Sequence, residues 1–391
     1  MKIAILTSGI RPVPAVQGGA VENLIDFFLG YNNRHHHHEI TVFSVWHPDV
    51  KKLPALRSEL NHYYYIKHNG LWAKAKRYIY HKQHQNGYYH YSIDYFFDQA
   101  YNKLQKKQYD LIIVENRPGF VLKLKEKSEI PCILHLHNDF LCTDTLKAKE
   151  IFDGYERIIC VSNYITKRVQ EICADKQNKC ITVNNAIDIL RFKKALPINR
   201  NQLCLSDDDF IVVYSGRLTK DKGILQLIQA IKQTQEVPNL KLLIIGASAY
   251  GKDKQPTPFI EQLEEESEPI KDKVVFTGFI NYVLVPSYLK MADIAVVPSM
   301  WEEPFGLTVV EAMAAGLPLI TTRSGGIPEI CEGVATIVDR ENIVENLANA
   351  ILDLYEHPEK RAAMAKASLE RSKFFDKETY AKNFFAALEG I

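Results

Sequence analysis

Short apolar runs alternate with helical patterns along the whole chain, and this alternation constrains the fold more than any other feature. In the first half, candidate strands occupy 2–7, 40–45, 110–115, 131–137, 157–162 and 180–185. In the second half, they occupy 210–216, 240–246, 273–278, 294–299 and 318–322. The runs are apolar on both faces, as in parallel strands that helices cover on both sides. The pattern predicts an α/β fold with two doubly wound parallel sheets.

The length of 391 residues also indicates more than one domain, because it exceeds what one hydrophobic core usually supports. The stretch around 188–209 lacks periodicity and is rich in Asp, Asn and basic residues. We therefore expect domains at 1–187 and 209–372, joined by a linker at 188–208. The last stretch, 373–391, has the pattern of a helix with aromatic anchors. Two such sheets that face each other leave a cleft at the carboxyl ends of their strands, where ligands bind in this architecture.

Composition excludes several classes of protein. A formal net charge of +1 gives no electrostatic case for a nucleic-acid-binding protein. The 7 cysteines are scattered without a Cys-x-x-Cys pair, which indicates buried, reduced thiols. The N-terminus enters a strand without a signal-peptide layout, and no apolar run reaches the ~18 residues that span a bilayer. We expect a cytoplasmic protein, or one that lies on the inner face of the cell membrane without crossing it.

The segment 60–93 differs from the rest of the chain, because it contains no acidic residue but is rich in Tyr, His and Lys. One interpretation is an insertion in the first domain, with solvated basic residues and tyrosines packed over a helix. The other is a surface that contacts anionic lipid head groups or a lipid-linked substrate, with aromatic side chains at the interface.

Two histidine patterns raise the question of a metal site. His35 to His38 form the tract 34-RHHHHE-39 in a connection after a helix, and four successive residues do not supply converging ligands. We therefore interpret the tract as an exposed loop. His135 and His137 are two residues apart and face the same side of one strand, but no third ligand is apparent in the nearby sequence. The sequence predicts no metal site.

The stretch 302-EEPFGLTVVEAMAAGLP-318 places a helix start at the edge of the second sheet. Leu307 or Thr308 begins a helix that Gly316 ends, and Pro318 begins the next strand. The free N–H groups of Gly306, Leu307 and Thr308 favour an anion, and a phosphate fits there.

Two carboxylates flank this helix start, Glu303 before it and Glu311 within it. A phosphate would repel them, so they must serve other groups. An ionised carboxylate only accepts hydrogen bonds and can hold two sugar hydroxyls. The expected ligand therefore contains both phosphate and sugar hydroxyls, as a nucleotide-sugar does.

Two glycine-containing loops extend this prediction. In 215-SGRLTKDKG-223, Gly216 permits close backbone approach, and Arg217 with Lys222 can neutralise a diphosphate without a metal. The alternative is two solvated surface cations. Gly18 and Gly19 directly precede a helix and leave room for backbone amides to contact a ligand, although such a pair also occurs in ordinary turns.

These features together resemble the retaining glycosyltransferases of family 4, which have the GT-B fold of two Rossmann-like domains. "EEPFGLTVVEAMAAGLP" matches the E-x7-E motif of that family, and the spacing selects Glu303 and Glu311 rather than Glu302. "YSGRLTKDKG" is similar to its diphosphate loop. Further similar segments are "VFTGF", "KMADIAVVPS", "TTRSGGIPEI", "GGAVENLI", "LHLHND" and "VNNAIDILRF". Ala186 stands where the family usually has glycine, and the segment 60–93 has no counterpart, which leaves the acceptor side open.

The resemblance implies a first domain that binds the acceptor, a second that binds the donor, and a C-terminal helix that crosses back to the first. It implies that Arg217 and Lys222 hold the donor diphosphate, with amides of Gly19 and of Gly306 to Thr308. Glu311 would accept from ribose hydroxyls, Glu303 would contact the transferred sugar, and His137 would lie by that sugar or its β-phosphate. The donor-binding set implied is Gly18, Gly19, Gly216, Arg217, Lys222, Phe279, Glu303, Phe305, Gly306, Leu307, Thr308 and Glu311.

The implied reaction is transfer of a sugar with retention, by front-face attack on an oxocarbenium-like centre. We expect a UDP- or GDP-sugar as co-substrate, no cofactor, and a saccharide or lipid-linked saccharide acceptor from polysaccharide, capsule or glycolipid synthesis. We also expect no metal requirement, because Asp207 to Asp209, the one Asp-x-Asp pattern, precedes a strand instead of following it.

Two other functions remain open. A nucleotide-sugar epimerase on the same scaffold would need a proton-abstracting group over the sugar ring, and formation of an epimer without acceptor would reveal it. A non-catalytic, transferase-like partner subunit would not hydrolyse a nucleotide-sugar. The sequence does not select the donor sugar, the acceptor or the oligomeric state.

Overall fold

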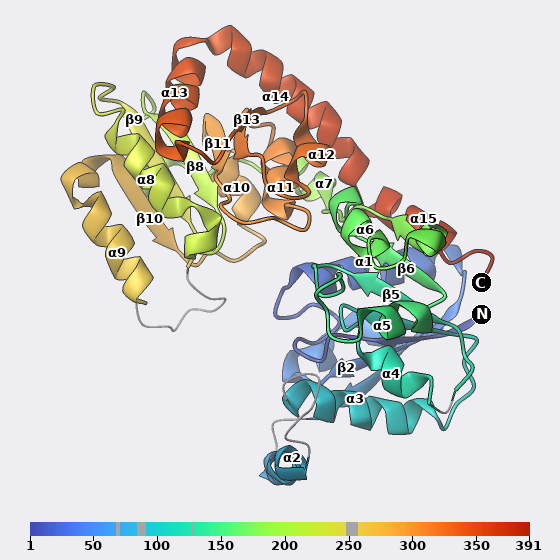
Figure 1. The fold of residues 1–391 in the computed structure, drawn as a ribbon. Coiled ribbons are helices and arrows are strands. Elements are labelled where there is room, and N and C mark those ends of the chain that lie inside the picture. Colours follow the sequence, from blue (N-terminus) through green and yellow to red (C-terminus); the bar gives the residue numbers. More distant parts are fainter. Residues whose placement is uncertain (68–70, 84–90, 127, 248–256) are drawn as a thin grey trace. The chain divides into compact units, whose positions relative to one another are not determined.

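The computed structural model describes residues 1–67, 71–83, 91–126, 128–247 and 257–391 (Figure 1). Contacts within the chain define two compact units. Unit 1 comprises Met1–Asn185 and Lys377–Ile391, and unit 2 comprises Ala186–Asp376. Each unit contains one parallel sheet with helices, so the predicted α/β fold with two Rossmann-like domains is confirmed.

The sheet of unit 1 has the strand order β3-β2-β1-β4-β5-β6-β7. Every pairing in it is parallel, and β1 pairs with β2 on one side and β4 on the other, with Ile3 opposite Ile40 and Leu111. The strand order reverses at β1, so the switch point where ligands bind in such sheets lies between β1 and β4. The strands are β1 Lys2–Leu6, β2 Glu39–Val45, β3 Asn61–Ile66, β4 Leu111–Glu115, β5 Cys132–Leu136, β6 Arg157–Cys160 and β7 Cys180–Thr182.

Helices cover both faces of this sheet (Figure 1). The last of them, α15, packs on α1, where Phe384 stacks on Phe28 with ring centroids 4.6 Å apart. An ion pair between Arg34 and Glu378 (2.6 Å) lies at the edge of the same contact. The core of unit 1 therefore includes side chains from the end of the chain. The helices are α1 Ala20–His35, α2 Leu71–Gln83, α3 Tyr91–Leu104, α4 Phe120–Leu124, α5 Ala148–Gly154, α6 Asn163–Gln170 and α15 Lys377–Ala386, with 3₁₀ turns at Pro48–Lys52, Pro54–Arg57 and Ala174–Lys179.

The sheet of unit 2 has the order β10-β9-β8-β11-β12-β13 and is also parallel throughout. Its switch point lies between β8 and β11. The strands are β8 Phe210–Ser215, β9 Leu240–Ile245, β10 Val274–Gly278, β11 Ile294–Val297, β12 Leu319–Thr322 and β13 Thr336–Val338.

The core of unit 2 packs α8 and α13 against β8 and β9, with fully buried Ile228, Leu242 and Leu347 among its members. The sequence 188–208, predicted as a linker, contains helix α7 and a 3₁₀ turn at Arg200–Leu203, and both are counted in unit 2. The helices are α7 Ile189–Lys194, α8 Ile224–Lys232, α9 Pro258–Ser267, α10 Val285–Leu289, α11 Leu307–Ala315, α12 Ile327–Cys331, α13 Ile343–Glu356 and α14 Pro358–Ser372, with 3₁₀ turns at Lys220–Lys222, Glu268–Lys273 and Lys373–Phe375.

The segment 60–93 is not an insertion over its full length, which corrects one sequence interpretation. Its first residues form the edge strand β3, which pairs with β2. Asn61 is buried, and its side chain accepts a hydrogen bond from Asn32 on α1 (2.8 Å). The hydroxyl of Tyr65 donates to the carbonyl of Val13 (3.1 Å). Residues 68–70 and 84–90 of this segment lie outside the described residues.

The histidine tract is also only partly the exposed loop that the sequence predicted. Helix α1 continues to His35, and His36 ends it in the left-handed conformation, with φ of 56°. His37 and His38 then lie against the ring of Phe385 on α15, with ring centroids 5.0 and 5.5 Å apart.

Within the described part of the chain, no helix is both long and apolar enough to cross a bilayer.

Candidate functional site

Unit 2 brings two loops together at the carboxyl edge of its sheet. One follows β8 and carries Lys222, and the other follows β11 and carries Glu303. The ammonium of Lys222 lies 2.6 Å from Oε1 of Glu303, which also accepts from the hydroxyl of Ser299 (2.8 Å). The Lys222 ammonium lies 4.9 Å from the centroid of the Trp301 ring. Both ionic side chains are largely shielded, at 18% and 12% exposed. The predicted diphosphate cation and the predicted sugar-binding acid are therefore direct neighbours.

Gly223 is what allows these two loops to approach so closely. Its φ is +72°, and a Cβ atom there would lie 1.8 Å from the carbonyl oxygen of Pro298. The backbone N–H of Met300 donates to the carbonyl of Asp221 (2.9 Å) across the same contact. Only glycine satisfies both the left-handed conformation and the close approach.

Glu302 and Glu303 have different surroundings, although they are adjacent in sequence. The Glu302 carboxylate accepts from the backbone N–H of Gly325 (2.5 Å) and forms an ion pair with Arg340. Glu302 therefore ties the loop to the segments after β12 and β13. Glu303 is left to face Lys222.

Helix α11 begins and ends where the sequence predicted. Gly306 precedes it with φ of 114°, and Gly316 ends it in the left-handed conformation. The first N–H groups of the helix, at Leu307 and Thr308, have no carbonyl partner within it and carry its positive dipole end. Both residues are half-buried, so an anion could reach them at the same edge as Lys222.

Glu311 lies inside this helix and is 7% exposed. Burial raises the pKa of its carboxyl to about 7, and a hydrogen bond with Tyr282 opposes part of that rise. The Arg191 guanidinium in turn lies over the Tyr282 ring at 5.6 Å. An acid held in this way accepts hydrogen bonds from hydroxyls when it is ionised.

The other predicted donor-side residues differ in how far they are exposed. Arg217 follows β8 and is exposed, and its guanidinium has no hydrogen bond or ion pair within the described ranges. Gly216 donates its N–H to the carbonyl of Ile245 (3.0 Å). Phe279 is half-buried after β10, whereas Phe305 is buried and packs edge-on against Phe375 (5.7 Å). The Phe305 ring therefore belongs to the core of unit 2.

Unit 1 has its own polar groups at the carboxyl edge of its sheet. Gly18 and Gly19 directly precede α1, with φ of 66° and 123°. A Cβ atom at Gly19 would lie 2.1 Å from a carboxylate oxygen of Glu22 in the first turn of the helix. The positive φ at both positions favours glycine, and the N–H of Gly18 donates to the carbonyl of Ala15 (2.9 Å).

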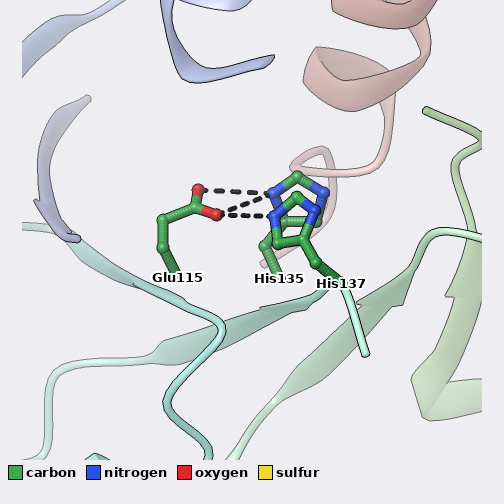
Figure 2. A group of neighbouring side chains, drawn as sticks. All are labelled: Glu115, His135 and His137. Atoms are coloured by element: carbon green, nitrogen blue, oxygen red, sulfur yellow. Dashed lines mark hydrogen bonds and ion pairs between the residues drawn. The ribbon is translucent and has the colours of Figure 1, made fainter. Parts of the chain in front are cut away.

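Figure 2 shows a buried cluster in which His135 and His137 both turn toward the carboxylate of Glu115. Glu115 ends β4, and the two histidines come from β5 and the residue that follows it. Oε2 of Glu115 lies 3.1 Å from Nδ1 of His135 and 3.0 Å from Nε2 of His137. All three side chains are buried, with at most 4% of each side chain exposed.

Glu115 is the third group that the sequence analysis did not find beside the two histidines. The donor atoms lie within 4.8 Å of one another, which is close enough to share a metal ion. The N–O separations are those of hydrogen bonds, so the carboxylate already satisfies one nitrogen of each ring. The signal available in sequence was an acid at the end of a buried strand next to a His-x-His strand.

The surroundings of this cluster lower the pKa values of both Glu115 and His137. Burial would raise the pKa of Glu115, but the charge of His135 and hydrogen bonds from both imidazoles lower it to about 2. Burial and the charge of His135 lower the pKa of His137 to about 4. At neutral pH, Glu115 is therefore ionised and His137 is neutral.

Comparison with known proteins shows what this chain is similar to. Residues 197–371 match the family described as glycosyl transferases group 1. The Anabaena protein Alr3699/HepE in complex with UDP has a TM-score of 0.74 and 20% identity, and the similarity covers 100% of both chains. Sucrose-phosphate synthase from Thermosynechococcus elongatus has a TM-score of 0.72 and 21% identity, over 99% of this chain and 98% of that one. The second half of the chain is thus similar to the glycosyl transferases group 1, and the whole chain shares the two-domain fold of these two structures.

Two curated relatives are also similar to this chain. Spore coat protein SA of Bacillus subtilis is 29% identical over 100% of this chain and 99% of its own length. The lipopolysaccharide 1,2-N-acetylglucosaminetransferase of Salmonella typhimurium is 24% identical over 66% of this chain and 67% of its own length.

Proposed function

We propose that the protein is a retaining glycosyltransferase of family 4 that moves a sugar from a UDP- or GDP-sugar to an acceptor hydroxyl without a metal ion. The observation that carries this proposal is the contact between Lys222 and Glu303 beside the N-terminus of α11. This edge offers a cation and free N–H groups to a diphosphate, and carboxylates to hydroxyls, within one unit.

The leaving diphosphate is the charge that the reaction must stabilise. Lys222 would act as a point charge on it, and the N–H groups of Leu307 and Thr308 would donate to its oxygens. Arg217 is exposed, and we expect its guanidinium to contact the diphosphate when donor binds. A preorganised donor of this kind contributes roughly 3–4 kcal/mol in other enzymes. The roles of Gly18, Gly19 and His137 toward the donor remain predictions.

The proposal is tested by measuring the melting temperature of the full chain with each member of a panel of nucleoside diphosphates and nucleotide-sugars. We expect one diphosphate to raise the melting temperature, Lys222→Met to abolish that rise, and the exposed neighbour variant Lys220→Met to preserve it. Transfer assays with the donor so identified then measure product configuration by NMR. An inverted product would refute retention, and epimer formed without acceptor would favour the epimerase. Activity that a chelator abolishes and manganese restores would refute metal independence.

We also propose that the acceptor is lipid-linked and that α2 contacts the anionic surface that carries it. The described side chains of α2 include exposed Tyr78 and Ile79, at 61% and 54%, next to exposed lysines, and its first turn has no acid. Apolar and aromatic groups among cations suit the interface of an anionic bilayer.

Flotation with vesicles of neutral and of anionic lipid tests this contact. Neutralising three α2 lysines should reduce binding to anionic vesicles, whereas neutralising three exposed lysines elsewhere in unit 1 should not. The α2 set is Lys74, Lys76 and Lys82, and the control set is Lys106, Lys107 and Lys167. Equal flotation with both kinds of vesicle would refute the proposal.

A further inference from the structure

Unit 1 contains a cavity of about 410 Å³ along the side of helix α1. Its walls come from the loop 14–16, helix α1, the turn at 53–55 and strand β3. Much of the lining is apolar, and a volume of this size falls in the range of small-molecule sites. Asp26 in its wall follows Ala20, the first residue of the helix, by six positions, which is about 9 Å along the helix axis. The cavity therefore lies beside the carboxyl edge of the sheet and not at it.

Three polar side chains line this cavity, and each has one group that is free to bind. Oδ2 of Asp26 accepts from the backbone N–H of Ala15 (2.8 Å), which leaves Oδ1 as an acceptor. The side-chain oxygen of Asn33 accepts from two neighbours (2.5 and 2.9 Å), but its amide nitrogen donates to no group among the described residues. The hydroxyl of Tyr63 likewise makes no hydrogen bond within the described ranges.

The Tyr63 ring is held in place close to the Asp26 carboxylate. It stacks on the ring of Tyr65, with centroids 6.0 Å apart and planes at 6°. The Tyr65 hydroxyl in turn donates to the carbonyl of Val13 (3.1 Å). Burial and the charge of Asp26 raise the pKa of Tyr63, so its hydroxyl remains protonated at neutral pH.

The polarity of these groups selects the kind of ligand. Asp26 offers an acceptor, Asn33 offers N–H donors, and the Tyr63 hydroxyl can act either way. A cation would satisfy the carboxylate but would be repelled by the amide N–H groups, and an anion would be repelled by the carboxylate. A hydroxyl group both donates and accepts, so a neutral ligand with several hydroxyls satisfies all three side chains. The C–H groups of a sugar ring would also pack on the apolar walls.

We propose that this cavity is a binding site for a neutral saccharide ring, separate from the site that transfers sugar, and that Asp26, Asn33 and Tyr63 hold the hydroxyls of the ring. The binding itself does not depend on the proposed function. Its role rests on the glycosyltransferase proposal: the ring is a unit of a glycan acceptor other than the unit that reacts.

Binding is tested by saturation-transfer NMR titrations of the full chain at pH 8. The probes are the methyl α-glycosides of glucose, galactose, mannose and N-acetylglucosamine. Burial raises the pKa of Asp26 to about 7, so its carboxylate is ionised at this pH. We expect at least one glycoside to bind, and Asp26→Asn and Tyr63→Phe each to lower its affinity by about fivefold or more. Asp26→Asn keeps an oxygen for the N–H of Ala15 but replaces the free acceptor by a donor.

Two control variants match these changes. Asp175→Asn alters an exposed acid elsewhere in unit 1. Tyr64→Phe removes the hydroxyl of the next residue of β3, whose ring lies on the other face of the sheet near Phe43 (5.6 Å). Both controls should leave the affinity for the glycoside unchanged. The rise in melting temperature that UDP causes should be the same in all four variants.

The other results are also decisive. The proposal is overturned if none of the four glycosides binds, or if the two cavity variants bind the glycoside as tightly as the wild type. Tighter binding of cyclohexylamine than of any glycoside would assign the cavity to a cation instead. Loss of the UDP effect in the cavity variants would mean that the two sites are not separate. A wild-type chain that binds a glycoside in the cavity but no nucleotide would refute the proposed function and retain the saccharide site.

Discussion

Replacing Glu311 by glutamine should stabilise the unliganded chain at pH 8 and have much less effect at pH 5. The carboxyl has a pKa of 4.5 in a solvated chain, and burial in α11 raises it to about 7. Well below pH 4.5, the acid is protonated in both states and the linkage cost vanishes. As pH rises toward 7, the unfolded chain releases the proton and the folded chain keeps it, so the folded state becomes less stable.

The size of the effect follows from these two values. Multiplying 2.303RT by the difference between 4.5 and about 7 gives a cost of about 3 kcal/mol above pH 7. At pH 5 the same linkage leaves a cost of about 1 kcal/mol. Glutamine carries no charge and avoids both, so Glu311→Gln should gain roughly 2 kcal/mol more at pH 8 than at pH 5.

Urea unfolding of the full chain at several pH values, followed by tryptophan fluorescence, measures this gain. The control is Glu264→Gln, because Glu264 is exposed on α9 and its variant should shift stability equally at all pH values. The variant Glu311→Gln should at the same time bind UDP more weakly, since the neutral amide replaces the acceptor proposed for the ribose. A gain that is identical at pH 5 and pH 8 would refute the argument from burial.

Three further outcomes are expected. Lys222→Met should lower kcat of the transfer reaction by at least 10²-fold with a smaller change in donor affinity, because leaving-group charge grows in the transition state; steady-state kinetics that show only a raised KM would contradict this. Gly223→Ala should destabilise the loop at Lys222 and abolish diphosphate binding by calorimetry, since its Cβ would strike a backbone carbonyl; normal binding would show that the loop can relax. Phe384→Ala should cost unit 1 roughly 3–5 kcal/mol by urea unfolding, because the ring is fully buried against Phe28; a cost below about 1 kcal/mol would mean that α15 contributes little to the core.

The fold was predictable from the sequence wherever strands are buried on both faces. Runs such as 111–114 and 242–245 are apolar throughout, and the structure places an interior strand at each. Strand β3 was missed because it lies at the edge of the sheet. The middle residues of 61-NHYYYI-66 are exposed or half-buried, so this strand needs no continuous apolar run. Strand β13 has only three residues, Thr336–Val338, which is too short for a periodic signal.

The candidate site was predictable where its residues are close in sequence or bordered by glycine. Glu303 was predicted because it directly precedes the start of a helix, and Lys222 because it lies in a glycine-containing loop before another helix. The structure brings the two side chains together, although they are 81 positions apart in the chain. Glu115 was not predictable in the same way, because its partners lie 20 and 22 positions away on another strand. Its only local feature is an acid at the end of an apolar run, which is common at strand ends.

The division of the chain also determines an order of events during synthesis. Unit 2 is one continuous stretch, whereas unit 1 needs Lys377–Ile391 to complete its core around Phe28. During synthesis, most of unit 1 therefore emerges from the ribosome first, but its core stays incomplete until the last residues emerge. Unit 2 can fold before that point. Nascent chains halted before residue 377 should accordingly expose apolar surface on α1 and attract chaperones, whereas chains released at full length should not.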